Sequence, residues 1–258
     1  MSYETIHYSE EDGVAVITLD RPEVMNALSS VMRGEITAAV LRARETARVI
    51  VVTGTGRAFC SGQDLADPAL AGGFDVARVL GEEYEPMLRA MVEAEVPVIA
   101  AVNGTAAGAG ANLALAADVV IAAESASFIQ AFTRIGLIPD AGGTWTLPRT
   151  VGLARAMGAA LFADKITAAQ AADWGMIWEA VPDEGFEAHW RARAASLAAG
   201  PGAAYARVKQ AMRASLGNDL DTQLALEARL QGECGATADF REGVVAFLEK
   251  RPARFTGR

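Results

Sequence analysis

Asp140 is the residue of this sequence whose surroundings most favour acid–base chemistry. It follows the apolar run Leu137-Ile138-Pro139 and precedes a glycine pair within residues 135–144. A carboxylate with apolar neighbours is poorly solvated, which raises its pKa and suits it to proton transfer. Pro-Asp-Ala-Gly is also ordinary turn chemistry, so a solvated turn aspartate is the alternative interpretation.

Two stretches of small residues can bring backbone amides close to a ligand. Residues 54–64 follow the apolar run 49–53, and residues 104–110 follow the run 98–102. If the two runs are neighbouring parallel strands, both stretches lie at the sheet edge where open α/β folds place ligands. Two amide donors aimed at one oxygen form an oxyanion hole, worth on the order of 10² to 10³ in rate per donor. The alternative is close packing of helix on strand through glycine. A dinucleotide fingerprint is disfavoured because the glycines do not fit its spacing.

Other site chemistries find little support. His7 and His189 are far apart and neither adjoins a nucleophile motif, which disfavours a Ser-His-Asp hydrolase. Cys60 and Cys234 are too few for a disulfide framework and lack the spacing of metal ligands. We therefore expect no metal site.

The elements that must position these residues follow from apolar periodicity. A hairpin is predicted at residues 5–8 and 14–19, where Glu11-Asp12-Gly13 forms the turn. Helices are expected wherever apolar residues recur at helical spacing, and strands where short apolar runs occur. The predicted strands are 49–53, 98–102 and 118–122, and the predicted helices are 30–46, 82–94, 105–117, 154–162, 168–174, 186–199, 203–215, 220–232 and 237–250. A surface loop is predicted over residues 67–73.

Composition limits the class of protein. With 258 residues, 52% of them apolar, the chain can bury a sizeable core. A net charge of -9 argues against a nucleic-acid partner, which needs clustered Lys and Arg. No signal peptide is recognised at the polar N-terminus, and no apolar run reaches the roughly 20 residues that a membrane span requires. We expect a cytoplasmic protein with no membrane partner.

Short motifs occur in order along nearly the whole chain. They are Arg21-Pro22 with Asn26-Ala27-Leu28, Ala58-Phe59-Cys60-Ser61-Gly62-Gln63-Asp64-Leu65, Val102-Asn103-Gly104 with Gly108-Ala109-Gly110, Gly136-Leu137-Ile138-Pro139-Asp140-Ala141-Gly142-Gly143, and Leu147-Pro148-Arg149. Together they resemble the crotonase (enoyl-CoA hydratase/isomerase) superfamily. Phe128-Ile129-Gln130-Ala131-Phe132 and Gly142-Gly143-Thr144-Trp145 are similar to its branch that isomerises 1,2-epoxyphenylacetyl-CoA in phenylacetate breakdown.

The resemblance implies an α/β fold, in which a crotonase-type spiral of ββα units is followed by a helical C-terminal region. We place the spiral core with its acyl-CoA site in residues 1–195 and a helical oligomerisation region in residues 196–258. Family members assemble as trimers or dimers of trimers, so a homotrimer or a dimer of trimers is expected here.

The same resemblance assigns roles to particular residues. The backbone amides of Gln63 and Ala109 would hold the thioester carbonyl oxygen, and Asp140 would carry the proton. Ala109 departs from the glycine often found there, although a backbone donor tolerates a methyl group. Substrate and CoA contacts are expected from Val24, Ala27, Ala58, Ser61, Gln63, Asp64, Leu65, Ala109 and Phe132. Phe128, Phe132 and Trp145 are candidates for an apolar acyl pocket, with plain core packing as the alternative.

Two missing glutamates decide the expected reaction. Hydratases of the superfamily carry glutamates at the positions of Asn112 and Phe132, and hydration normally needs two acid–base groups. A shift of a double bond needs only one base, for which Asp140 matches the isomerase position. We therefore expect an acyl-CoA isomerase, acting on a ring epoxide or on a 3-enoyl chain, with coenzyme A as part of the substrate and no separate cofactor. The alternatives are an enoyl-CoA hydratase and a non-catalytic acyl-CoA-binding or scaffold protein.

Overall fold

A six-stranded sheet forms the base of the computed structural model, which describes residues 3–67 and 75–257. Its strands, in sheet order, are β1 (Ile6–Glu11), β2 (Val14–Leu19), β3 (Val49–Gly54), β5 (Val98–Val102), β7 (Val119–Ala123) and β10 (Glu179–Val181). β1 and β2 form the predicted antiparallel hairpin, and all other neighbours are parallel. β5 is buried along its whole length, as expected for a parallel strand covered on both faces.

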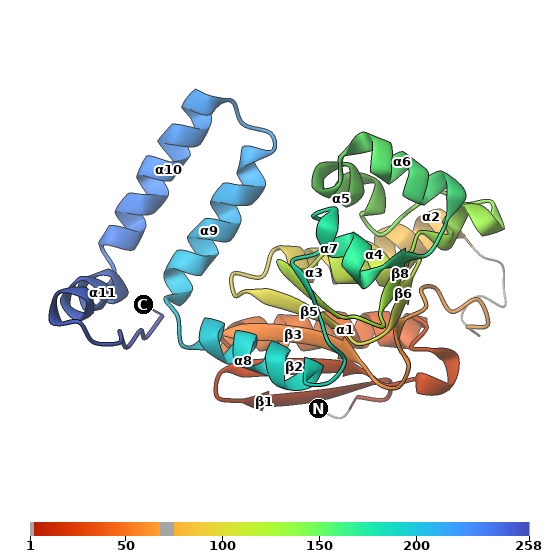
Figure 1. Cartoon of the computed structure of the whole chain (residues 1–258), viewed down its shortest axis with the longest axis horizontal. Helices are drawn as coiled ribbons and strands as arrows, with labels where there is room; N and C mark the ends of the chain where they lie inside the picture. The colour runs from red at the N-terminus through yellow and green to blue at the C-terminus, as the bar shows by residue number, and fades with distance from the viewer. Residues whose placement is uncertain (1–2, 68–74, 258) are drawn as a thin grey trace.

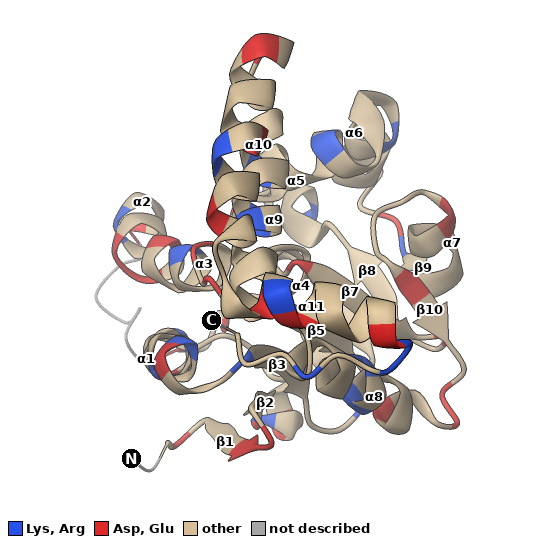
Figure 2. Ribbon diagram, turned by 90° about the vertical axis from the view of Figure 1, so that its left-hand side faces the viewer, with Lys and Arg blue, Asp and Glu red and all other residues tan. Residues whose placement is uncertain are grey.

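Helices cover this sheet on two sides. α1 (Ser30–Thr46) begins where the Ser29 hydroxyl accepts a hydrogen bond from the Met32 amide, as a capping serine does. α1 and α8 (Phe186–Ala198) lie on opposite faces of the sheet (Figure 2), and α8 buries Trp190 against it. These two helices confirm the periodicity-based predictions.

A second, four-stranded sheet was not predicted. It consists of β4 (Ala58–Cys60), β6 (Thr105–Ala107), β8 (Ser127–Ile129) and β9 (Ile166–Thr167), in that order. The prediction of one helix over residues 105–117 is wrong at its start, because β6 pairs with β4 and β8 before α4 (Ala109–Leu115) begins. Tertiary pairing overrides the helical preference of alanine here.

Several further helices precede the C-terminal region. A continuous helical segment runs through α2 (Val76–Val79), the π-helical turn η3 (Leu80–Tyr84) and α3 (Glu85–Val92). The others before the C-terminal region are η1 (Pro22–Val24), η4 (Ala131–Ile135), α5 (Gly143–Thr150), α6 (Gly152–Phe162) and α7 (Ala168–Asp173). Apart from Asp67, the loop predicted over residues 67–73 lies outside the described residues.

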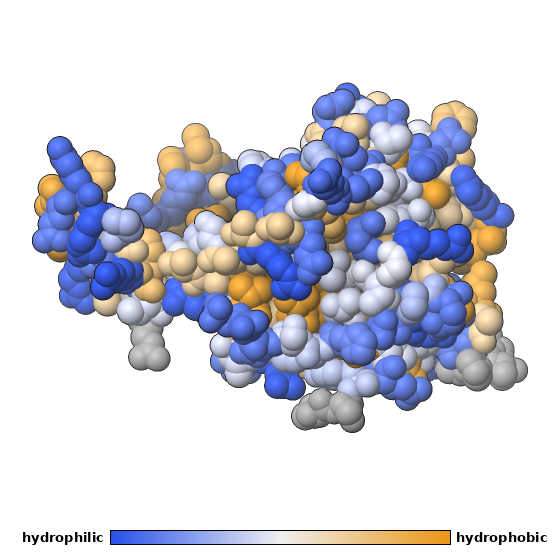
Figure 3. All heavy atoms as spheres, turned by 60° about the horizontal axis from the view of Figure 1, so that its bottom comes forward, coloured by the Kyte–Doolittle hydropathy of each residue, from blue (hydrophilic) through white to orange (hydrophobic). Residues whose placement is uncertain are grey.

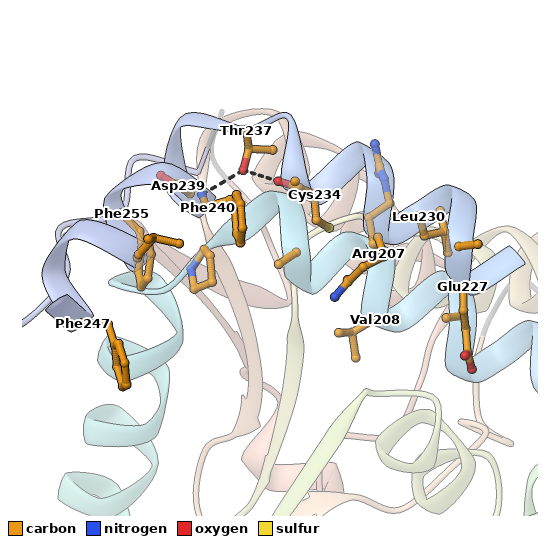
Figure 4. Close-up of a pocket in the computed structure, with 18 of the residues that line it drawn as sticks. Arg207, Val208, Glu227, Leu230, Cys234, Thr237, Asp239, Phe240, Phe247 and Phe255 are labelled. Carbon is orange, nitrogen blue, oxygen red and sulfur yellow. Dashed lines mark hydrogen bonds between the residues drawn. The ribbon is translucent and has the colours of Figure 1, made fainter. Parts of the chain in front are cut away.

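Three C-terminal helices extend away from the sheets (Figure 1). They are α9 (Gly202–Ser215), α10 (Leu220–Gly235) and α11 (Ala238–Glu249). A hollow of about 1020 Å³ lies among them, and Phe240, Phe247 and Phe255 line it (Figure 4). Apolar side chains are also exposed on this region (Figure 3); Phe247 is 83% and Met212 69% exposed. The predicted boundary between residues 195 and 196 falls within α8 and stays a prediction.

Basic and acidic residues are distributed over several of the described helices (Figure 2), and some form ion pairs one helical turn apart. On α3, for example, Arg89 contacts both Glu85 and Glu93 at 2.7 and 3.0 Å. No helix of the described chain is both long and apolar enough to cross a membrane.

Candidate active site

The predicted proton carrier and the two predicted amide donors line one cavity of about 260 Å³. Gln63 comes from the loop after β4, Ala109 from the first position of α4, and Asp140 from the turn before α5. The other lining residues are Ser61, Gly62, Leu65, Val76, Val79, Leu80, Tyr84, Gly108, Ala131, Phe132, Arg134, Ile135 and Leu137. Three segments far apart in the sequence thus meet at one largely apolar space.

The backbone around Gln63 is held so that its own amide stays unbonded. The Leu28 amide donates to the Gly62 carbonyl at 2.7 Å, and the Asp64 amide donates to the Leu28 carbonyl at 3.2 Å. The amides of Gln63 and Ala109 have no acceptor within the described chain. For Ala109 the reason is its place at the start of α4, where a helix offers no carbonyl four residues back.

Gly62 brings the two amide-bearing turns into contact. A Cβ at this position would lie 2.8 Å from the Ala107 carbonyl oxygen and 3.3 Å from the Ala109 nitrogen. Its φ of +97° also lies in the region that favours glycine. The close approach requires glycine, and it places the Gln63 and Ala109 amides at adjacent points of the cavity wall.

Asp140 lies in a turn that withdraws its carboxyl from water. Burial raises the pKa of this carboxyl from 3.8 to about 6. Its Oδ1 is buried and has no hydrogen-bond partner in the described part of the chain. The next two residues, Ala141 and Gly142, have φ values of +48° and +81°, and the left-handed region costs a non-glycine residue about 1 to 2 kcal/mol. With a pKa of about 6, the Asp140 carboxyl can gain and lose a proton close to neutral pH.

Asn112 supports the Asp140 turn from behind the cavity. Its Nδ2 donates to the Asp140 carbonyl at 2.7 Å, and its Oδ1 accepts from Gln130 Nε2 at 2.9 Å. The side chains of Asn112 and Gln130 are buried, and neither lines the cavity. A Cβ on Gly143 would come within 2.8 Å of Asn112 Cγ, so the carboxamide fits closely under the start of α5. The Asn112 carboxamide therefore joins the Asp140 backbone to the Gln130 side chain.

Four residues predicted to contact substrate or CoA do not line the cavity. Asp64 is 7% exposed and accepts from Arg21 Nη1 at 2.8 Å, while the same nitrogen donates to the Ala27 carbonyl at 2.7 Å. Val24 is 37% exposed, and its carbonyl accepts a hydrogen bond from the Ser61 hydroxyl at 3.2 Å. The fourth, Ala58, is buried in β4. These residues hold the loop of Gln63 against the chain near Val24, and their CoA contacts stay predictions.

Of the three residues predicted to form an apolar acyl pocket, only Phe132 lines the cavity. Phe132 lines the cavity, whereas Phe128 is fully buried in the core. Trp145 is 50% exposed, and the Arg149 guanidinium lies 4.6 Å from the centre of its ring. Trp145 lies in α5, which begins at Gly143, and it does not line the cavity.

The cavity wall contributed by α2 and η3 was not found from the sequence. Val79, Leu80 and Tyr84 all line the cavity. The Tyr84 hydroxyl donates to Gln63 Oε1 at 2.9 Å, and burial raises the pKa of this phenol well above its usual value, so it stays protonated. The only sequence signal was an aromatic residue within a predicted helix, which is more typical of core.

The chain is similar to known proteins over nearly its whole length. The family model described as enoyl-CoA hydratase/isomerase matches residues 9–258. A protein of Rhodobacter capsulatus named "Probable enoyl-CoA hydratase" is 70% identical over 258 residues, covering 100% of both chains. The 1,2-epoxyphenylacetyl-CoA isomerase of Escherichia coli is 46% identical over 257 residues, which cover 96% of this chain and 97% of that protein. The structure of an enoyl-CoA hydratase from Bacillus anthracis superposes with a TM-score of 0.93 at 32% identity, covering 99% of this chain and 100% of the other.

Proposed function

Because the chain belongs to the enoyl-CoA hydratase/isomerase family of the crotonase superfamily, we propose that it isomerises an acyl-CoA thioester with Asp140 as its base. The observation that carries this proposal is the acid–base content of the cavity. Asp140 is the one carboxylate among the described residues that line it, and Gln63 and Ala109, whose amides are unbonded within the described chain, line the same cavity. One base suffices to move a proton between two carbons of the same substrate, whereas hydration normally employs two groups.

In the proposed mechanism the thioester carbonyl oxygen accepts hydrogen bonds from the amides of Gln63 and Ala109. Asp140 removes a proton from the α-carbon, and the electron pair moves into the carbonyl to form an enolate. The two amides stabilise the negative charge that develops on that oxygen. Asp140 then returns the proton to the γ-carbon, so the double bond moves into conjugation and no atom is gained or lost. At neutral pH, a pKa of about 6 leaves the Asp140 carboxyl mostly ionised before the reaction, and the protonated carboxyl can release its proton afterwards.

Two residues argue against hydration as the main reaction. Asn112 and Phe132 occupy the two positions at which hydratases of the superfamily carry glutamates. The Asn112 carboxamide is committed to Asp140 and Gln130, and Phe132 contributes an apolar ring. Hydration is nevertheless the second candidate, because the relative that is 70% identical is named as a hydratase.

The acyl group is proposed from the relatives and from the wall of the cavity. The relative that is 46% identical acts on 1,2-epoxyphenylacetyl-CoA, and apolar residues such as Phe132, Leu137 and Val79 suit either an aromatic ring or an enoyl chain. We propose that the loop of residues 58–65, with Val24 and Ala27 beside it, holds the CoA moiety. No cofactor besides this CoA is part of the proposal.

A panel of thioesters tests the proposed function. Purified protein would be incubated with 3-enoyl-CoA, 2-enoyl-CoA and 1,2-epoxyphenylacetyl-CoA, and the products identified by mass spectrometry and NMR. We expect isomerised products of unchanged mass from the first or the third substrate. Conversion of 2-enoyl-CoA to a product heavier by one water, at a rate that exceeds any isomerisation, would support the hydratase instead.

A further inference from the structure

A fully buried arginine lies behind the loop of Gln63. Arg33, in α1, is 0% exposed, and a charge withdrawn from water is costly unless it is paired and hydrogen-bonded. Its Nε and Nη2 donate to Glu83 Oε2 at 3.1 and 2.5 Å. Its Nη1 donates to the Leu28 carbonyl at 2.6 Å and to Gln63 Oε1 at 2.9 Å. One guanidinium therefore joins α1, the segment before it, the Gln63 loop and η3.

The side chain of Gln63 is fully engaged inside the protein. Its Oε1 accepts from Arg33 and from the Tyr84 hydroxyl, and its Nε2 donates to the Asp64 carbonyl at 2.9 Å. The Arg33 guanidinium also lies 4.8 Å from the centre of the Tyr84 ring, within the range of a cation–π contact. These contacts give the side chain an anchoring role and leave the backbone amide of the same residue to the cavity.

Arg33 also acts on the backbone that flanks this amide. Leu28, whose carbonyl accepts from Arg33, is the residue that pairs with Gly62 and Asp64 on either side of Gln63. Glu83 keeps the charge balanced, and it accepts a further hydrogen bond from the Ser30 hydroxyl at 2.7 Å. The guanidinium thus holds Gln63 through its side chain and through its strand partner.

We infer that Arg33 is a positioning residue, which aligns the Gln63 amide with the thioester oxygen; this inference rests on the oxyanion role of Gln63 proposed above. A fixed donor stabilises a developing charge without reorganising during the reaction. A displacement near 1 Å can cost about 10²-fold in rate, so a rigid support for a single N–H has a measurable effect.

The test uses the intact protein with three variants and one control. Arg33→Met removes the guanidinium, Arg33→Lys keeps the charge but loses the fork of donors, and Tyr84→Phe deletes one hydroxyl. The control is Arg44→Met on the same helix; the Arg44 side chain is 42% exposed, and it forms an ion pair with the neighbouring Glu45. Circular dichroism and thermal unfolding establish that each variant folds.

The decisive readout is the infrared stretch of the thioester carbonyl in bound butyryl-CoA carrying ¹³C at that carbon. Butyryl-CoA has no double bond to move, and hydrogen bonds to the carbonyl lower its frequency. We expect the lowered frequency in the wild type and in Arg44→Met, and a return toward the frequency of free butyryl-CoA in Arg33→Met and Arg33→Lys. For isomerisation, kcat should fall about 10- to 10²-fold in Arg33→Met with little change in KM, as expected for a displaced donor.

The results distinguish a failed positioning role of Arg33 from a failed oxyanion role of Gln63. A folded Arg33→Met protein with wild-type frequency and kcat would overturn the inference, even if its melting temperature had fallen. If Arg33→Met does not fold, Arg33→Lys decides, and an unchanged frequency and kcat in that variant would overturn the inference. Tyr84→Phe keeps the Arg33 bonds to Gln63 and Leu28, so a larger change in Tyr84→Phe than in Arg33→Lys would overturn it as well. If bound butyryl-CoA shows no lowered frequency in the wild type, the oxyanion role of Gln63 fails and the role of Arg33 fails with it.

Discussion

Replacing Asp140 by Asn should abolish isomerisation and, at the same time, stabilise the protein above pH 6. Asparagine keeps the shape of the side chain but cannot accept a proton, and loss of a general base typically costs about 10² to 10⁴ in rate. The gain in stability arises because the folded chain disfavours the ionised carboxyl, whose pKa is raised by burial. The two effects have one cause, so they should appear together.

The size of the stability effect follows from the pKa. A carboxyl with a pKa of about 6 in the folded chain and 3.8 in the unfolded chain is less favourably ionised after folding by about 3 kcal/mol, at 1.36 kcal/mol per pH unit. Because the cavity beside Asp140 can admit water, which screens the charge, we take about 1 to 2 kcal/mol. The folded state binds more protons between pH 3.8 and 6, so wild-type stability falls as pH rises through this window. The advantage of the Asn variant should therefore grow over this window and stay constant above it.

Thermal unfolding of both proteins at pH 4, 6 and 8 measures this advantage, with about 2 to 4 °C expected per kcal/mol in a chain of this size. Asn112→Ala is the matched control. It removes one of the two donors to the Asp140 carbonyl, which keeps the Gly143 amide, and it leaves the buried Gln130 Nε2 without its acceptor. It should therefore lower stability by about 1 to 3 kcal/mol at every pH and reduce kcat far less than Asp140→Asn. Wild-type turnover in Asp140→Asn, or a difference in melting temperature that does not vary with pH, would refute the assignment of a buried catalytic carboxyl.

Three further outcomes are expected. The pH profile of kcat/KM should rise through an acidic limb near pH 6, where Asp140 ionises, and a limb near pH 4 would show a solvated carboxyl instead. Gly62→Ala should destabilise the protein by more than about 1 kcal/mol and lower kcat, because the new methyl group meets the Ala107 carbonyl and the Ala109 amide; unchanged unfolding and kinetics would contradict this. Light scattering should report a homotrimer or a dimer of trimers, in keeping with the exposed apolar side chains of α9–α11, and a monomer mass at all concentrations would exclude that assembly.

Long periodic segments could be predicted from the sequence, and short paired ones could not. The runs that became β2, β3 and β5 are continuous and apolar, and α1 has both its apolar spacing and its capping serine. β4, β6, β8 and β9 have two or three residues each, too few to show a period of two. Their existence depends on pairing between distant segments, which a single sequence does not reveal.

Only some residues of the candidate site could be predicted from the sequence. Asp140, Gln63 and Ala109 lie in motifs, and they do meet at one cavity. Arg33 gave no signal, because a charged residue on a helix is usually solvated and only the packing of Glu83 and Tyr84 over α1 buries it. Trp145 is the opposite case. As an aromatic residue within a motif it was a candidate for the acyl pocket, but it lies at the surface.

The fit of Asn112 under Gly143 restricts how this protein can vary. The carboxamide that supports the Asp140 turn occupies the space that any side chain at position 143 would need. A larger residue at 143 can be accepted only if residue 112 becomes smaller, and the smaller residue would no longer reach the Asp140 carbonyl. A side chain at position 143 should therefore require a smaller residue at position 112, whereas residue 112 can become smaller while Gly143 is kept.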